Sequence, residues 1–215
     1  MRHIFPLVVA MATASSALAD LRITEVMSSS SSASPTPDWF EVTNYGPSAV
    51  SLSDWRMDDG SFNLAAAVAL SGISSIGAGE SVVFIESAAG SGIAAFRANW
   101  GGLSGIQVGY YSGSGVGLSS SVDGVGIFSG AGTLVTQVSF GAATGGSSFF
   151  WGYGPGGVVN PSYNGLVSTV GAIGGQVAYT ASNGDVGSIG TAIAIPAPGA
   201  IALVGLVAIR GRRRR

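Results

Sequence analysis

The sequence predicts an all-β fold with one short helix. Glycine accounts for 35 of the 215 residues, and charged residues make up only 9%. Short runs of β-branched and aromatic residues are each followed by Gly, Pro, Asn or Asp, which is the pattern of strands joined by tight turns. The glycines have no three-residue period, so the chain is not collagenous. Hydrophobic residues reach 47%, which excludes disorder driven by high charge and low apolarity.

The first 19 residues predict a secretory signal peptide. Arg2 and His3 give a positively charged start, and an apolar stretch covers 4–14. Ala17 and Ala19 form the small-x-small pattern that signal peptidase recognises, so cleavage would make Asp20 the mature N-terminus. The alternative is an N-terminal segment that is buried in the domain.

The last 20 residues predict a short transmembrane-type helix followed by a basic cluster. A helix over 196–209 would be about 21 Å long at ~1.5 Å per residue, against a hydrocarbon core of ~30 Å, so it is a marginal span. By the positive-inside rule the cluster stays in the cytoplasm; its members are Arg210, Arg212, Arg213, Arg214 and Arg215. A basic tail that binds nucleic acid is the alternative, but it would need solvated flanks instead of an apolar run.

The chain between these ends is acidic and has no cysteine. From residue 20 to about 195 it holds eleven acidic residues and three basic ones, a net charge of −8, and no lysine. This charge argues against binding to nucleic acid or anionic lipid, and it favours a self-repelling surface or one that attracts divalent cations. A domain of about 175 residues can be stable without disulfides.

The first strands are predicted at 21–27 and 38–44, separated by a serine-rich loop. The turn sequence 44–47 ends the second strand, and a shorter apolar piece with Leu52, Trp55 and Met57 follows it. Trp39 and Trp55 are costly to leave in water, so both are expected in the core.

The middle of the chain predicts a buried strand at 81–86, a helix at 91–100 and a strand at 106–111. Ile93, Phe96 and Trp100 lie on one helix face, Ser91 is placed to cap the start, and glycines 101–102 end it.

A hairpin is predicted next, with strands at 125–128 and 134–140 joined by 129–132. Alternation places Leu134, Thr136, Val138 and Phe140 on its core-facing side. Further strands are predicted at 149–151, 166–170 and 176–180, and 179–190 is expected to be a closing loop.

Three segments resemble the lamin-tail domain family. They are Ile23-x-Glu25-Val26-Met27; Asp38-Trp39-Phe40-Glu41-Val42 with Asn44, Gly46, Leu52, Trp55 and Asp58-Asp59-Gly60; and Asp123-Gly124-Val125-x-Ile127-Phe128 with Gly132, Leu134 and Val135. The resemblance implies an immunoglobulin-like β-sandwich over 20–190, followed by a linker at 191–195. In bacteria this family occurs in exported and surface proteins.

The C-terminal tail, 196–215, resembles a PEP-CTERM sorting signal. Pro196 and Pro198 match its Pro-x-Pro motif, 199–209 its apolar segment, and the arginines its basic end; Ala197 stands where the motif usually has Glu. The resemblance implies transient anchoring in the inner membrane of a Gram-negative bacterium, processing by an exosortase-type membrane enzyme, and release to the cell surface or extracellular space.

The residue types exclude several chemistries. His3 is the only histidine, so the segment after the signal peptide has neither His nor Cys; catalytic triads and the common zinc sites are therefore excluded. Asp38 with Glu41, or Asp58 with Asp59, could serve glycoside hydrolysis, but these residues lie in turns and at strand ends. Asp54, Asp58 and Asp59 offer the oxygen ligands that calcium requires, although they equally fit a solvated turn.

These observations predict an exported structural or adhesive protein that is not an enzyme and needs no cofactor. Extracellular polysaccharide and other surface proteins are its expected partners, with no role for nucleic acid. The alternatives are a lectin-like module that binds glycan or calcium, and a secreted hydrolase.

Overall fold

The computed structural model describes residues 20–31, 36–154 and 157–193. The predicted signal peptide at 1–19 and sorting tail at 196–215, with its short helix, lie outside these ranges. Among the described residues, no helix has the length and apolar character needed to span a membrane.

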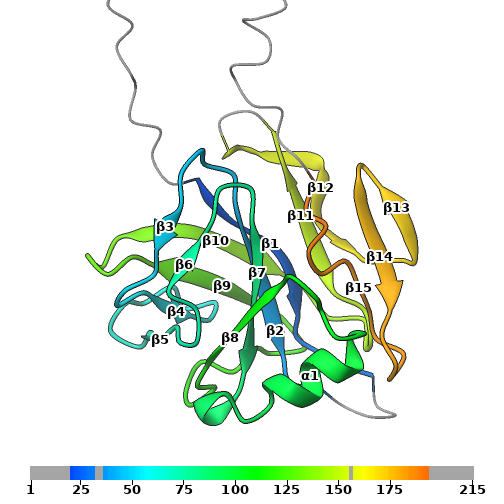
Figure 1. Cartoon of the computed structure of the whole chain (residues 1–215), viewed down its shortest axis with the longest axis horizontal. Helices are drawn as coiled ribbons and strands as arrows, with labels where there is room; N and C mark the ends of the chain where they lie inside the picture. The colour runs from blue at the N-terminus through cyan, green and yellow to red at the C-terminus, as the bar shows by residue number, and fades with distance from the viewer. Residues whose placement is uncertain (1–19, 32–35, 155–156, 194–215) are drawn as a thin grey trace, which may run out of the picture.

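Two packed sheets form the predicted β-sandwich (Figure 1). The main sheet has six strands in the order β12 (Val159–Val167), β11 (Phe149–Tyr153), β1 (Leu21–Met27), β2 (Trp39–Asn44), β7 (Ser81–Glu86) and β8 (Gln107–Tyr111). The second sheet has four, in the order β10 (Leu134–Phe140), β9 (Asp123–Phe128), β4 (Arg56–Asp58) and β5 (Val68–Ala69).

The remaining elements are short. β3 (Val50–Ser51) pairs with β6 (Ser75–Ile76), while β13 (Gly171–Ile173), β14 (Gln176–Thr180) and β15 (Val186–Gly187) form a three-stranded sheet. A 3-10 turn, η1 (Ala88–Gly90), leads into α1 (Ile93–Asn99).

The first core lies between the two large sheets. Phe40 and Phe84 stack there with ring centroids 5.6 Å apart, and Phe40 also contacts Tyr111. Trp55 is buried in this core, as predicted.

A second core covers the opposite face of the main sheet, and the sequence analysis did not predict it. Trp39 is buried there, so the two tryptophans of the N-terminal strands lie on opposite sides of the sheet. Trp39 packs edge-on against Phe96 at 6.1 Å and Trp100 at 5.6 Å, and Trp100 packs against Tyr179 at 5.6 Å. Helix α1 and the segment after β14 thus add a third layer, and all six residues of β2 are buried.

A β-bulge in β1 decides which side chains enter each core. Ile23 pairs with Val42 but Glu25 pairs with Glu41, so Thr24 is one extra residue in β1. The insertion reverses the alternation: Leu21 and Ile23 face the first core before it, whereas Met27 faces the second core after it.

The predicted helix is confirmed, but its start differs. Ser91 does not cap α1; the Oγ of Ser87 instead accepts a 2.9 Å hydrogen bond from the Gly92 N–H. Gly101 and Gly102 end the helix with φ of 78° and 93°, a region that glycine enters without strain. The helix is the crossover between β7 and β8, which therefore pair in parallel.

The predicted hairpin is confirmed as β9 and β10, with one correction. Thr136, Val138 and Phe140 are buried as expected, but Leu134 is 39% exposed. A second bulge lies between Leu134 and Thr136, so Val135 packs against the core instead.

The C-terminal third of the domain matches the predicted strands in part. β11 and β14 lie where they were predicted. The strand predicted at 166–170 instead begins at Val159 and ends at Val167, and it contains Pro161, which an edge strand tolerates. Residues 191–193, predicted to open a linker, pack on the domain: Thr191 bonds to Val177, and Ile193 is buried.

We expect the second core to contribute much of the stability. Trp100→Ala should lower the free energy of unfolding by about 3–5 kcal/mol, because it removes a large buried ring that touches three other aromatic rings. Val122→Ala, at a side chain that is 73% exposed, is the control and should change it by less than about 0.5 kcal/mol. Urea denaturation measures both, and equal stability of the two variants would contradict the role of this core.

Candidate functional site

Both ends of the described domain meet at Tyr45. Its N–H donates a 2.9 Å hydrogen bond to the Asp20 carbonyl, and its hydroxyl donates a 2.8 Å bond to the Ile193 carbonyl. Burial is the main cause that raises the pKa of the Tyr45 hydroxyl above its usual value, so the hydroxyl stays a donor. Asp20 and Ile193 therefore lie at one pole of the domain, which we call the terminal pole.

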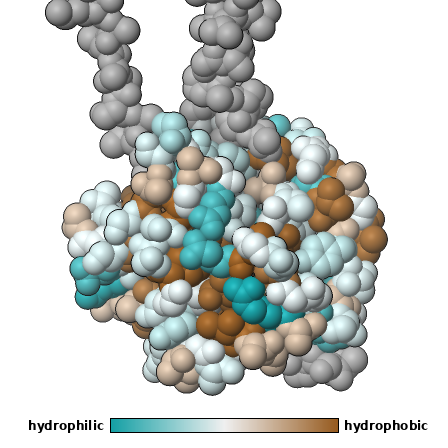
Figure 2. Space-filling view, viewed as in Figure 1, coloured by the Kyte–Doolittle hydropathy of each residue, from teal (hydrophilic) through white to brown (hydrophobic). Residues whose placement is uncertain are grey.

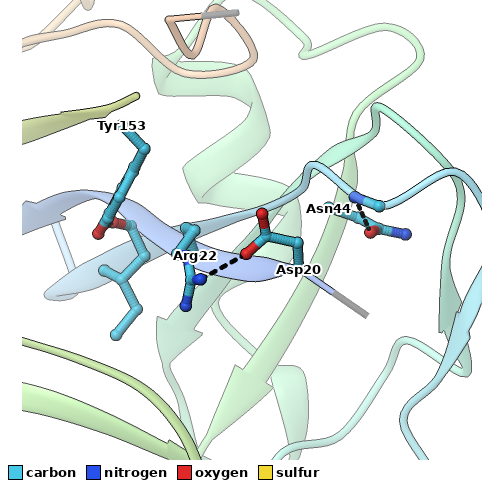
Figure 3. Close-up of polar contacts among 6 residues, drawn as sticks. Asp20, Arg22, Asn44 and Tyr153 are labelled. Carbon is cyan, nitrogen blue, oxygen red and sulfur yellow. Dashed lines mark hydrogen bonds and ion pairs between the residues drawn. The ribbon is translucent and has the colours of Figure 1, made fainter. Parts of the chain in front are cut away.

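An open groove lies beside the terminal pole. Arg22 forms a 2.6 Å ion pair with Asp20, and its guanidinium carbon lies 5.8 Å from the centre of the Tyr153 ring (Figure 3). The Tyr153 hydroxyl donates a 2.7 Å bond to the Ile23 carbonyl, which fixes the ring. The groove has a volume of about 250 Å³, and Thr136 and Gln137 add polar groups to its lining. A cation, an aromatic ring and amide and hydroxyl groups in one groove suit a polar, hydroxyl-rich ligand.

The three aspartates of the calcium hypothesis have separate surroundings. Asp54 is exposed beside Arg56 in a second groove of about 360 Å³. Asp58 is buried, and its Oδ2 accepts 2.6 Å bonds from the Ser61 hydroxyl and the Asn63 N–H. Asp59 accepts the Ser61 N–H. Asp58 and Asp59 thus shape the turn that follows β4.

No metal site of three or more Asp, Glu, His or Cys side chains is formed within residues 20–31, 36–154 and 157–193. The arrangement of Asp54, Asp58 and Asp59 therefore gives no support to calcium binding at these positions.

Two buried glutamates form a polar cluster that the sequence analysis missed. Glu25 and Glu41 are register partners on β1 and β2, and they are 0% and 1% exposed. The bulge at Thr24 turns Glu25 toward the second core, where it lies next to Glu41. The signal in the sequence was an acidic residue between apolar residues in each of the two strands.

The two carboxyls hold the segment 188–190 on the main sheet. Glu25 accepts bonds from the Ser188 N–H at 2.7 Å, the Ser188 hydroxyl at 2.8 Å and the Ser148 hydroxyl at 2.5 Å. Glu41 accepts bonds from the Gly190 N–H and from the Thr24 hydroxyl. We call Glu25 and Glu41 the latch, because their hydrogen bonds hold the end of the domain in place.

Burial raises the pKa of both latch residues. The pKa of Glu25 is raised to about 8, first by burial and then by the charge of Glu41, while its hydrogen bonds oppose the shift. Burial raises the pKa of Glu41 to about 7. The pair therefore retains a proton near neutral pH.

Asp38 and Glu41, the pair considered for glycoside hydrolysis, do not come together. The two side chains leave β2 and its N-terminal extension on opposite faces of the main sheet: Glu41 faces the second core, and Asp38 the side of the first. They cannot flank one substrate bond.

We expect the free energy of unfolding to fall as the pH rises from about 5 to about 8. In this window the folded latch keeps protons that the unfolded carboxyls, with an ordinary pKa of 4.5, have released, so raising the pH favours the unfolded state. The double variant Glu25→Gln, Glu41→Gln should show a smaller pH dependence in chemical denaturation, and Asp54→Asn should behave as the wild type. A stability that increases across this window would contradict the assignment.

The comparisons with known proteins agree with the fold. The family model of the Lamin Tail Domain matches residues 14–142, more than half of the chain. The match begins within the predicted signal peptide and ends well before residue 190, so β11 to β15 lie beyond it. No curated protein and no solved structure matches the chain. On the strength of the family match and the β-sandwich, the chain belongs to the lamin tail domain family.

Proposed function

We propose that this chain is an exported, non-enzymatic protein of the cell surface or extracellular matrix, sorted through its C-terminal tail by an exosortase-type system. The observation that carries the proposal is the terminal pole. Asp20 and Ile193 are both bonded to Tyr45, so the predicted tail follows directly from the pole where the domain also begins. A domain anchored by that tail would present its opposite pole to the surroundings.

The roles of the acidic side chains support a structural function. Glu41 is buried and, as part of the latch, accepts the Gly190 N–H, while Asp58 accepts hydrogen bonds within its own turn. Two of the carboxylates considered for hydrolysis are thus engaged in the fold, and residues 20–193 contain no His or Cys to take over acid–base or nucleophilic chemistry.

An exposed hydrophobic area supports an adhesive role. Five of the eight large hydrophobic side chains that are exposed among the described residues lie on β12, β14 and the turns beside them: Val158, Leu166, Val167, Val170 and Val177. Figure 2 shows hydrophobic surface on the right of the molecule, where Figure 1 places β13 and β14. Exposed apolar side chains on neighbouring strands are a surface on which contacts with other proteins can form.

Mass spectrometry of the exported protein tests the sorting proposal. We expect a mature chain that begins at Asp20 and lacks the terminal arginines, because both ends are removed during export. Replacing the five tail arginines with Gln should leave the tail uncleaved, whereas Arg56→Gln, the control, should be processed as the wild type. Detection of Arg215 on the mature protein would contradict the proposal.

Binding of a polysaccharide is a second candidate function, favoured by the groove that contains Arg22 and Tyr153. If the groove binds glycan, Gln137→Ala should weaken binding roughly three- to tenfold on a glycan array, which corresponds to the loss of one hydrogen bond. Gln107→Ala, outside the groove, is the control. Equal binding by the two variants would place the ligand elsewhere.

A further inference from the structure

A row of three polar side chains crosses the main sheet at the pole opposite the terminal pole. Asp38 lies just before β2, Glu86 ends β7 and Tyr111 ends β8. The Glu86 N–H donates a 2.8 Å bond to the Asp38 carbonyl, and Glu86 and Tyr111 are register partners. Neighbours in such a row place their side chains on the same face of a sheet. That face is the first core, because Phe40 and Phe84, each two residues away along the chain, belong to it.

The row lies far from the chain ends because β1 and β2 are antiparallel. β1 starts beside Asp20 and runs to the other end of the sheet, where β2 begins. Figure 1 shows the start of β2 and the ends of β7 and β8 in the lower half of the molecule, and the start of β1 in the upper half.

The hydroxyl of Tyr111 has no partner among the described residues. The side chain is 0% exposed, and its oxygen accepts and donates no hydrogen bond there. Burial raises the pKa of Tyr111 well above its usual value, and the charges of Glu86, Asp38 and Asp123 raise it further, so the hydroxyl lies within electrostatic reach of these carboxylates. A buried polar group without a partner destabilises the fold and calls for an explanation.

The carboxylates of Asp38 and Glu86 also lack donors. Neither accepts a hydrogen bond from residues 20–31, 36–154 or 157–193. Burial raises the pKa of Asp38 to about 7, and the charges of Glu86 and Asp123 contribute. The basic side chains of the domain are engaged or distant: Arg22 pairs with Asp20 at the terminal pole, Arg97 bonds to the Leu103 and Ile106 carbonyls, and Arg56 lines the second groove. Negative charge gathers here without a counterion.

A glycine-rich loop passes over Glu86. A Cβ at Gly113 would lie 1.8 Å from the Glu86 Oε1 and a Cβ at Gly117 3.6 Å from Oε2, so the backbone of the loop lies directly against this carboxylate. The buried side chains of Val116 and Leu118 hold this loop on the first core. The backbone of the loop is therefore fixed close to the carboxylate.

Asp123 differs from the other two acids. Its oxygens accept the N–H groups of Gly60, Gly124 and Ser119, so it adds charge to the site and has few lone pairs left for a ligand. Asp38 and Glu86 are thus the candidate carboxylate ligands, and Asp123 is not. This agrees with the finding that no three carboxylates converge in the described residues.

We propose that Asp38, Glu86 and the Tyr111 hydroxyl bind a divalent cation, and that the cation is Ca²⁺. The available ligands are oxygens only, which suits a hard cation, and Ca²⁺ tolerates irregular geometry in which waters and loop carbonyls complete its coordination. The cation removes the repulsion between the carboxylates and gives the buried hydroxyl oxygen a partner. With two carboxylates, the affinity belongs in the range of extracellular calcium modules, with a Kd of about 10⁻⁴–10⁻³ M.

Calcium titration of the full-length protein after treatment with a chelator tests this site. We expect the melting temperature to rise by about 2–4 °C when Ca²⁺ reaches roughly ten times its Kd. Asp38→Asn with Glu86→Gln should abolish the shift, and Tyr111→Phe should weaken calcium binding measured by calorimetry. The control is Asp54→Asn with Asp59→Asn, which should keep the full shift.

The melting temperature of the Asp38→Asn, Glu86→Gln variant also shows whether this variant folds. Since it removes two like charges, its melting temperature in the presence of chelator should equal or exceed that of the wild type. A wild-type protein that shows no shift up to ~10 mM Ca²⁺ would overturn the proposal. So would a shift that survives in the Asp38, Glu86 variant or disappears in the Asp54, Asp59 variant.

Discussion

The structure depends on a main sheet that is buried on both faces. Antiparallel sheets commonly have one face in water, and their strands then alternate between apolar and polar residues. Here the second sheet covers one face, and α1 with the segment after β14 covers the other. The bulge at Thr24 makes this possible in β1, because it sends Ile23 and Met27 to different cores. The polar residues of these strands are consequently inside the protein.

Those buried polar residues form hydrogen bonds with one another and with the segment 188–190, which follows β15. Thr24 bonds to Glu41 and Thr43, and Thr43 bonds to Ser81, which gives a line of hydroxyl groups across the sheet. Glu25 and Glu41 complete the line by accepting N–H groups from the segment 188–190. Buried polar groups that lack such partners are costly, so this network fixes the position of the chain end as well as the register of the strands.

Local patterns in the sequence predicted the strands and the hairpin well. Runs such as 81–86 and 134–140 show the strand signal directly, and Phe96 and Trp100 show the helical spacing. The second core was not predictable in this way, because a bulge changes the face of a residue without changing its sequence pattern. The parallel pairing of β7 with β8 depends on how the helix packs, which is likewise a tertiary property.

The polar sites were harder to predict than the fold for a related reason. Glu25 and Glu41 are 16 residues apart in sequence, and Asp38, Glu86 and Tyr111 lie just before β2 and at the ends of β7 and β8. Their proximity follows from strand order and register, which no local spacing records. Asp54, Asp58 and Asp59 are close in sequence, yet Asp58 accepts hydrogen bonds within a turn while Asp54 is exposed to solvent.

The latch also affects when the domain can finish folding. In a chain that crosses a membrane from its N-terminus, Glu25 and Glu41 arrive early, whereas Ser188 and Gly190 are nearly the last residues of the domain to emerge. Until then neither carboxyl can accept the N–H groups of Ser188 and Gly190 that it accepts in the folded domain. In such a chain, formation of the latch therefore depends on the passage of almost the entire domain.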